Sequence, residues 1–224
     1  MRTRDIPAYV VHGPHLVDRR ARLGADLEGQ GVTPEWIDEF VAASLDPKVV
    51  RRHYRPNRLR WRRRTALTQR IPFRELTPAE IAVGISHAEA FRRIAAREPE
   101  WGFVFEDDVL LDPDFAERLD VYLPELPPDA DLVFVGTCCG LHANDVEPGV
   151  HFYRQGDPSS RCCDSYLVSR RAARILAKAA VPFVVTMDWE LSYHAARHDL
   201  HVYWLEPPLA VQGSETGAYA SSLR

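Results

Sequence analysis

The chain has 224 residues, 46% of them hydrophobic, which suits a single domain (residues 1–224) with a substantial core. Its 28 Lys and Arg residues nearly balance 32 Asp and Glu residues, so the net charge of −4 does not favour any class of charged partner. No window approaches the length of a membrane span and the N-terminus lacks the apolar core of a signal peptide, so we expect a cytoplasmic protein.

The first 30 residues predict the opening of an α/β fold. Residues 8–12 form a short apolar run that predicts a strand, Gly13 and Pro14 interrupt it, and a helix is expected over 17–30. The end of a first parallel strand is where such folds bind nucleotides. The absence of a G-x-G-x-x-G motif and of a P-loop argues against a dinucleotide or NTP site of the usual kind.

A strongly basic segment follows a second predicted strand at residues 35–41. Residues 48–70 contain ten basic residues and no acidic ones: Lys48, Arg51, Arg52, Arg55, Arg58, Arg60, Arg62, Arg63, Arg64 and Arg70. One interpretation is a patch for an anionic acceptor or nucleic acid. We favour the other, a solvated, mobile insertion whose arginines pair with acids elsewhere, because Tyr54 and Trp61 are too few for a base-stacking platform.

The clearest helix is expected over residues 76–98. Thr77, Pro78 and Glu80 form a capping box with proline in the first turn, and apolar residues then recur at helical spacing. Gly84 interrupts the helix at a cost of about 1 kcal/mol against alanine, which indicates close packing or a nearby ligand. Beside it lie Ser86 and His87, and the pattern alone favours a core histidine with a satisfied hydrogen bond.

The residues from Trp101 to Leu111 carry the main chemical signal. An apolar run over 103–105 predicts a buried strand, and it ends in three carboxylates, Glu106, Asp107 and Asp108. Buried acids without a partner are costly, whereas a hard divalent cation such as Mg²⁺ or Mn²⁺ takes oxygen ligands of this kind. The alternative is a solvent-facing acidic turn whose following acids cap the next helix.

The second half predicts a mixed sheet with further helices. Helices are expected over 114–123, 170–180 and 186–198, and strands over 131–136, 150–153, 161–168 and 201–205. Residues 216–224 are expected to form a mobile tail. Asp188 and Glu190 fall in the first turn of a helix, where acids are stabilised by the helix dipole, typically by about 0.3–1 kcal/mol. The functional alternative is a base projecting from the helix start into a cleft.

The four cysteines occur as two adjacent pairs, Cys138-Cys139 and Cys162-Cys163. This is not the spacing of a zinc site. We favour buried, reduced thiols, because a disulfide between the pairs would need neighbouring strands.

Several segments in order resemble glycosyltransferase family 25, the lipooligosaccharide and procollagen galactosyltransferase family. The resembling residues are 76–87, 103–109, 165–173, 187–189 and 208–212, with a looser match in the first strand and helix. The resemblance implies a GT-A fold: a Rossmann-like nucleotide-binding domain with a mixed β-sheet flanked by helices. It also implies a nucleotide-sugar donor, most often UDP-galactose, and inversion at the anomeric carbon. Lipopolysaccharide biosynthesis is the corresponding process.

The resemblance also suggests roles for particular residues. Asp108 matches the metal-binding position, with Glu106 on the same side of an extended backbone. A carboxylate must take the proton from the acceptor hydroxyl, and Asp188 is the first candidate, with Glu190 second. The expected donor contacts are Val10, Val11, His12, Ser86, His87, Glu106, Asp107 and Gln212. The cofactor would be Mn²⁺ or Mg²⁺, which would stabilise the charge of the UDP leaving group.

The expected function is therefore transfer of a hexose from a UDP-hexose to a saccharide, lipid-linked or peptide acceptor. Nucleic acid is not an expected partner, and residues 48–70 leave open a peripheral contact with the inner face of the membrane. Two other functions use the same features. A metal-dependent phosphoester hydrolase would use the acids of residues 106–108. A non-catalytic protein would hold an acidic polymer through the arginine-rich segment.

Overall fold

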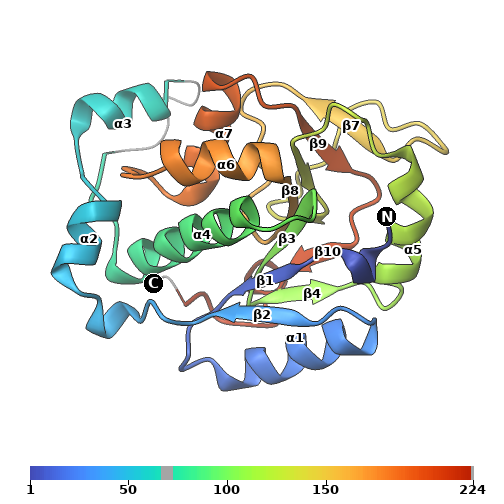
Figure 1. Cartoon of the computed structure of the whole chain (residues 1–224), viewed down its shortest axis with the longest axis horizontal. Helices are drawn as coiled ribbons and strands as arrows, with labels where there is room; N and C mark the ends of the chain where they lie inside the picture. The colour runs from blue at the N-terminus through green and yellow to red at the C-terminus, as the bar shows by residue number, and fades with distance from the viewer. Residues whose placement is uncertain (67–72, 223–224) are drawn as a thin grey trace.

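The computed structural model describes residues 1–66 and 73–222, and its centre is a seven-stranded mixed sheet (Figure 1). The strand order is β2-β1-β3-β8-β5-β9-β7. The strands are β1 (Ala8–Val11), β2 (Pro34–Ile37), β3 (Trp101–Glu106), β5 (Leu132–Phe134), β7 (Phe152–Gln155), β8 (Ser165–Ser169) and β9 (Val202–Leu205). β2, β1 and β3 are parallel, whereas β8 runs antiparallel between β3 and β5. The predicted α/β class with a mixed sheet is confirmed.

Helices cover both faces of this sheet. One core packs strand side chains against α4 (Pro78–Ala96), α6 (Arg170–Ala179) and α7 (Met187–Arg197). The opposite core packs them against α1 (Val17–Gly29) and α5 (Phe115–Tyr122). Successive strand residues therefore face different cores. No helix in the described part of the chain has the length and apolarity needed to cross a membrane.

A small second sheet extends the edge at which β3 ends. It contains β4 (Val109–Leu111), β10 (Ala210–Gln212) and β6 (Gly136–Thr137), with β10 in the middle. The register pairs Gln212 with Val109, the residue after the three carboxylates. This pairing brings Gln212, which the resemblance placed among the donor contacts, beside the acidic turn.

The predicted capping box begins α4. The Thr77 hydroxyl accepts a hydrogen bond from the Glu80 amide at 3.2 Å, and the Glu80 carboxylate accepts one from the Thr77 amide at 2.8 Å. Gly84 inside this helix is explained by packing, because a Cβ there would lie 2.7 Å from Cζ of Phe183. Of the two expected reasons for this glycine, the structure supports close packing.

Short helices complete the chain. They are η1 (Thr3–Asp5), η2 (Ala42–Ser44), α2 (Pro47–His53), α3 (Arg58–Arg64), η3 (Leu123–Glu125) and α8 (Gly213–Thr216). The arginine-rich segment therefore folds into α2 and α3, and Arg70 lies outside the described residues. The expected pairing of its arginines with distant acids is wrong for all described members except Arg64, which contacts Glu190 at 3.0 Å.

The C-terminal residues were expected to form a mobile tail, but Tyr219 and Ala220 contact α1 and Ser221 and Ser222 line a cavity; residues 223–224 are outside the described part. The Arg19 guanidinium lies 4.9 Å from the centre of the Tyr219 ring. It also donates a hydrogen bond to the carbonyl of Ala220 at 2.5 Å. These contacts bring the tail to the edge of the sheet at which β1 and β3 end.

Candidate active site

A cavity opens at the carboxyl ends of the parallel strands β1 and β3. Its floor is formed by the turn of Glu106, Asp107 and Asp108 and by the loop after β1. Residues 40–42 and the first turns of α4 contribute an apolar wall, and Gln212, Ser214 and the tail add polar groups to the lining. Topology explains the location, because loops that follow neighbouring parallel strands meet at one edge of a sheet.

Asp107 holds the loop after β1 in place. Its carboxylate accepts hydrogen bonds from Nδ1 of His12 at 2.9 Å, the amide of Gly13 at 3.0 Å and Nη1 of Arg19 at 2.9 Å. Burial acts to raise the pKa of Asp107, but these donors together hold it below its ordinary value. Asp107 is therefore ionised and already bonded to the protein, so its part in the site is to shape the loop.

Asp108 has an oxygen that the protein leaves without a partner. The residue is 5% exposed, and its Oδ1 is buried without a hydrogen bond from any described residue. Burial raises the pKa of this carboxyl. Its backbone carbonyl accepts a hydrogen bond from Gly213 at 2.8 Å, and a Cβ on Gly213 would approach that carbonyl to 2.5 Å. The site thus presents a fixed carboxylate oxygen that needs an external partner.

Glu106 belongs to a buried network with His87. Oε1 of Glu106 lies 3.2 Å from Nε2 of His87, whose Nδ1 lies 2.9 Å from the hydroxyl of Tyr166. Nε2 of Gln212 donates a hydrogen bond to Oε2 of Glu106 at 3.4 Å.

Burial, and then the charges of neighbouring acids, raise the pKa of Glu106 to about 8. Burial lowers the pKa of His87 to about 4. In the absence of a cation, Glu106 therefore keeps its proton at neutral pH and His87 is uncharged. Their contact is a hydrogen bond between neutral groups, although its geometry also fits an ion pair.

The two candidate bases on α7 have different surroundings. Oδ1 of Asp188 is buried without a hydrogen-bond partner among the described residues, and the negative charge of Asp188 acts to raise the pKa of both Glu106 and His87. Burial raises the pKa of Asp188. Glu190 is fully buried, pairs with Nε of Arg64 and accepts a hydrogen bond from the Val184 amide at 2.8 Å. The structure thus gives Glu190 a structural role, contrary to its place as second candidate base.

The other predicted donor contacts differ in position. Val11, His12 and Ser86 line the cavity, although Oγ of Ser86 donates its hydrogen bond to the carbonyl of Ala82 at 3.0 Å. Val10 is fully buried in the core on the α1 side, so its side chain does not reach the cavity. The alternation of side chains along β1 separates Val10 from Val11.

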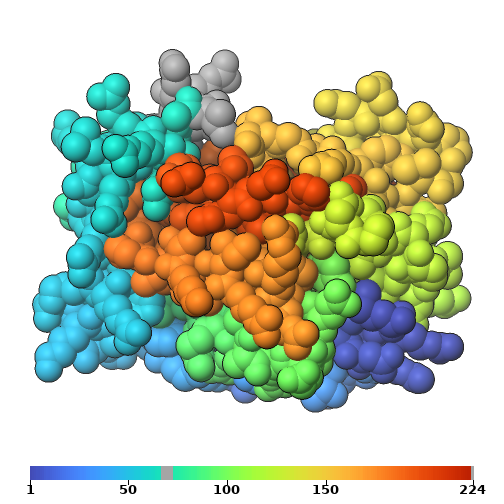
Figure 2. All heavy atoms as spheres, turned by 45° about the horizontal axis from the view of Figure 1, so that its top comes forward, coloured from blue at the N-terminus to red at the C-terminus, as the bar shows by residue number. Residues whose placement is uncertain are grey.

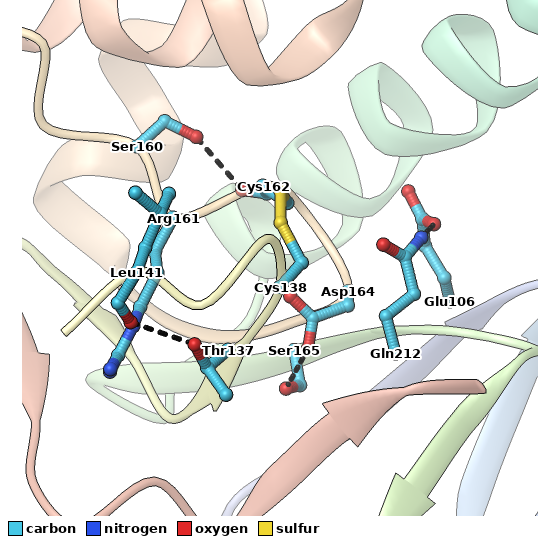
Figure 3. The surroundings of a disulfide bond; sticks show 10 residues. All are labelled: Glu106, Thr137, Cys138, Leu141, Ser160, Arg161, Cys162, Asp164, Ser165 and Gln212. Carbon is cyan, nitrogen blue, oxygen red and sulfur yellow. Dashed lines mark hydrogen bonds between the residues drawn. A yellow bond between two sulfur atoms is a disulfide. The ribbon is translucent and has the colours of Figure 1, made fainter. Parts of the chain in front are cut away.

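Sequence reasoning missed Asp164. This residue precedes β8, and its carbonyl accepts a hydrogen bond from the Glu106 amide at 2.7 Å. Its fully buried carboxyl accepts a hydrogen bond from Oγ of Ser165 at 2.9 Å, and burial raises its pKa to about 7 (Figure 3). Asp164 precedes β8, whereas Glu106 to Asp108 lie at the end of β3. Residues at these two positions lie at the same end of neighbouring strands only if the strands are antiparallel, as β3 and β8 are. The sequence contains no signal for that pairing.

A disulfide joins the two loops next to this acid. Cys138 is bonded to Cys162 across Cα atoms 6.3 Å apart, while Cys139 is an exposed thiol and Cys163 a buried one (Figure 3). The prediction of reduced thiols is therefore wrong for Cys138 and Cys162. Cys138 directly follows β6 and Cys162 lies before β8, and the amide of Val135, the residue between β5 and β6, donates a hydrogen bond to the carbonyl of Ser165 at the start of β8.

Comparisons with known proteins identify the family. A sequence profile described as glycosyltransferase family 25 (LPS biosynthesis protein) matches residues 16–139, more than half of the chain. No curated protein matches the chain. The chain therefore belongs to glycosyltransferase family 25, and it is a glycosyltransferase.

Solved structures show only distant likeness. A197 from STIV is 11% identical, with 94% of this chain and 83% of that chain covered and a TM-score of 0.44. A glycosyltransferase involved in glycosylation of the major capsid of PBCV-1 is 13% identical; the alignment covers 95% of this chain and 96% of that chain, with a TM-score of 0.44. The inositol-1-phosphate CTP transferase from T. maritima is 13% identical; the alignment covers 96% of this chain and 73% of that chain, with a TM-score of 0.43.

Proposed function

We propose that this glycosyltransferase moves a hexose, with galactose from UDP-galactose as the first candidate, onto a hydroxyl of a saccharide, lipid-linked or peptide acceptor. The transfer proceeds with inversion and requires Mn²⁺ or Mg²⁺. The observation that carries the proposal is the buried Oδ1 of Asp108, which has no partner among the described residues, in a cavity at the ends of β1 and β3.

The residues present fit a divalent cation. Asp108 offers a free carboxylate oxygen, and the raised pKa of Glu106 reflects burial together with acids that a cation would neutralise. Hard oxygen ligands of this kind suit Mg²⁺ or Mn²⁺, which bind through few carboxylates and leave positions for substrate phosphate. When bound, the ion would stabilise negative charge on the departing diphosphate.

The remaining walls suit a nucleotide. Phe40 and Val83 contribute apolar surface to the cavity, which Gln212 also lines. Cofactor and nucleotide pockets commonly combine such surface with a few placed polar groups. In our proposal the base lies along the apolar wall, and the diphosphate lies over the turn that contains Asp108. Glu106 and Gln212, hydrogen-bonded to each other, then lie close to the sugar.

Asp188 takes the acceptor proton in this proposal. An inverting transfer needs a base on the face of the sugar opposite the leaving group, and a base works best when its pKa approaches the operating pH. Burial raises the pKa of Asp188, and its buried Oδ1 has no hydrogen-bond partner among the described residues. As the acceptor oxygen bonds to the anomeric carbon, its proton moves to Asp188 and the bond to the UDP oxygen breaks.

Calorimetric titration with a panel of nucleotide sugars, with and without Mn²⁺, tests the proposal. We expect one UDP-sugar to bind in a metal-dependent way and Asp108→Asn to abolish that dependence. The matched control is Asp114→Asn, which removes an exposed carboxylate outside the cavity. Failure of every nucleotide sugar to bind in Mn²⁺, or equal loss in both variants, would refute the proposed donor and metal site.

The hydrolase alternative has less support. Two-metal hydrolases gather several ligands around ions about 3.5–4 Å apart. Among residues 1–66 and 73–222, no group of three His, Asp and Glu side chains has its ligand atoms within 4.8 Å of one another. A single ion held by two carboxylates and the donor diphosphate does not need such a group.

A further inference from the structure

The short helices α2 and α3 carry a dense group of exposed cations, which we call the arginine surface. Its members are Lys48, Arg51, Arg52, Arg55, Arg58, Arg60, Arg62 and Arg63. Within the described part of the chain, none of these eight side chains forms a salt bridge or a hydrogen bond with a carboxylate. Figure 2 shows the segment in cyan at one end of the molecule, with side chains extending outward.

The charge distribution indicates a partner outside the chain. Residues 48–70 hold ten of the 28 basic residues and none of the 32 acidic ones, so the rest of the chain is strongly acidic. Concentrating like charges on two short helices costs repulsion that the protein's own acids could relieve but, in this fold, do not. An external polyanion would relieve that repulsion.

The arginine surface also exposes apolar groups. Leu59 is 70% exposed and lies between Arg58 and Arg60, and Trp61 is half-buried one position further on. A leucine and a tryptophan among arginines are typical of helices that lie in the interface of an anionic bilayer. There the apolar groups enter the headgroup region while the guanidinium groups meet phosphates.

The aromatic residues of the segment are not arranged for nucleic acid. Tyr54 is buried, and its hydroxyl accepts a hydrogen bond from the Leu76 amide at 2.9 Å. The Trp61 ring packs edge-to-face on Phe73 with centroids 5.8 Å apart, and Arg58 covers the same Phe73 ring. Binding of single strands relies on aromatic faces that are free to stack on bases.

The arginine surface is connected to both sides of the active site. Phe40 and Ala42, which line the cavity, lie just before α2 in the chain. Arg64, at the end of α3, pairs with Glu190 on α7, the helix that also contains Asp188. A surface that docks through α2 and α3 would therefore hold the cavity close to whatever it docks on.

We propose that the arginine surface docks this enzyme onto an anionic phospholipid bilayer, with Leu59 entering the headgroup region. Docking is a binding event separate from sugar transfer. It would place a lipid-linked acceptor near the cavity, and that consequence alone rests on the proposed function.

Co-sedimentation with vesicles tests the docking. Vesicles of phosphatidylcholine mixed with phosphatidylglycerol are compared with phosphatidylcholine alone, at low and high salt. We expect binding only to the anionic vesicles and a steep loss with salt. A variant with Arg58→Gln, Arg60→Gln, Arg62→Gln and Arg63→Gln should bind more than tenfold more weakly, since each basic residue near such a surface contributes about 1 kcal/mol.

The matched control removes four charges elsewhere, through the exposed Arg2→Gln, Arg174→Gln, Lys178→Gln and Arg197→Gln. It should keep nearly full binding, and both variants should melt like the wild type because the changed residues are exposed. Leu59→Gln should weaken the binding that persists at high salt. Equal loss in both fourfold variants, or tight binding to an oligonucleotide without vesicle binding, would overturn the proposal. Neither outcome would affect nucleotide-sugar binding.

Discussion

Two regions of this molecule concentrate charge of one sign, and they do so in opposite ways. At the edge where β3 ends, Glu106, Asp108 and Asp164 are drawn together by the sheet and largely removed from water. The arginine surface gathers eight cations, seven on α2 and α3 and Arg55 between these helices, and all of them remain exposed. At the acidic edge, burial and neighbouring charges raise the pKa of Glu106 and of Asp164.

The difference has a physical cause. Burial removes the water that stabilises a carboxylate, so a buried group must bind a proton, a donor or a cation. Exposed arginines keep their hydration, so each one interacts only weakly with other charges of the protein. A ligand at the acidic edge therefore supplies a partner to buried groups, whereas a partner at the arginine surface relieves the mutual repulsion of hydrated cations. The Arg64–Glu190 pair links the two regions.

The largest expected effect is on transfer. Asp188→Asn keeps the shape of the side chain but cannot accept a proton, so kcat for sugar transfer should fall by about 10²–10⁴-fold. Binding of the nucleotide sugar, measured by calorimetry, should stay within a few-fold of the wild type, because the change is outside the cavity floor. Unchanged kcat in this variant would show that another group takes the proton.

The next effect is on folding, at the link between the regions. Glu190→Ala leaves the buried guanidinium of Arg64 without its carboxylate and the Val184 amide without its acceptor. Breaking a buried pair in this way typically costs about 3–5 kcal/mol, measurable by urea denaturation. Arg92→Ala, which removes an exposed partner of Glu89, is the comparison and should cost less than about 1 kcal/mol. Equal losses would contradict the structural role of Glu190.

The smallest effect is a change in the pH dependence of stability. Asp164 has a pKa of about 7 in the folded protein, above its ordinary value of 3.8. Between these values the unfolded chain has lost the proton and the folded chain retains it. The wild-type free energy of unfolding should therefore decrease as pH rises from about 4 to about 7.

Asp164→Asn removes this contribution. The measurement is made in a buffer that contains a metal chelator. The free energy of unfolding should then differ between about pH 4 and pH 8 by about 1–4 kcal/mol less in the variant than in the wild type, since one pKa unit corresponds to about 1.4 kcal/mol. Asp114→Asn, at an exposed position, should leave the slope unchanged. A slope in Asp164→Asn that equals the wild-type slope would show that this acid ionises normally in the folded protein.

The sequence predicted the local elements because their signals are local. The capping box at Thr77 begins α4 within two residues of the predicted start, and the apolar run over 103–105 is the buried centre of β3. The acidic turn was identified because three carboxylates at a strand end have few structural explanations. The expected Mn²⁺ or Mg²⁺, the donor and the cytoplasmic location remain predictions.

What the sequence determined by itself was the α/β class, most of the main helices and strands, and the acids at the end of β3, since each depends on residues close together in the chain. The family followed from several such local motifs in order. Only the tertiary structure decided which polar groups meet. Antiparallel pairing brings Asp164 beside Glu106, and packing of α3 on α7 pairs Glu190 with Arg64, while Oδ1 of Asp188 has no partner among the described residues. The same applies to the bond between Cys138 and Cys162. Contacts of this kind join residues 24 to 126 positions apart, and no local pattern specifies them.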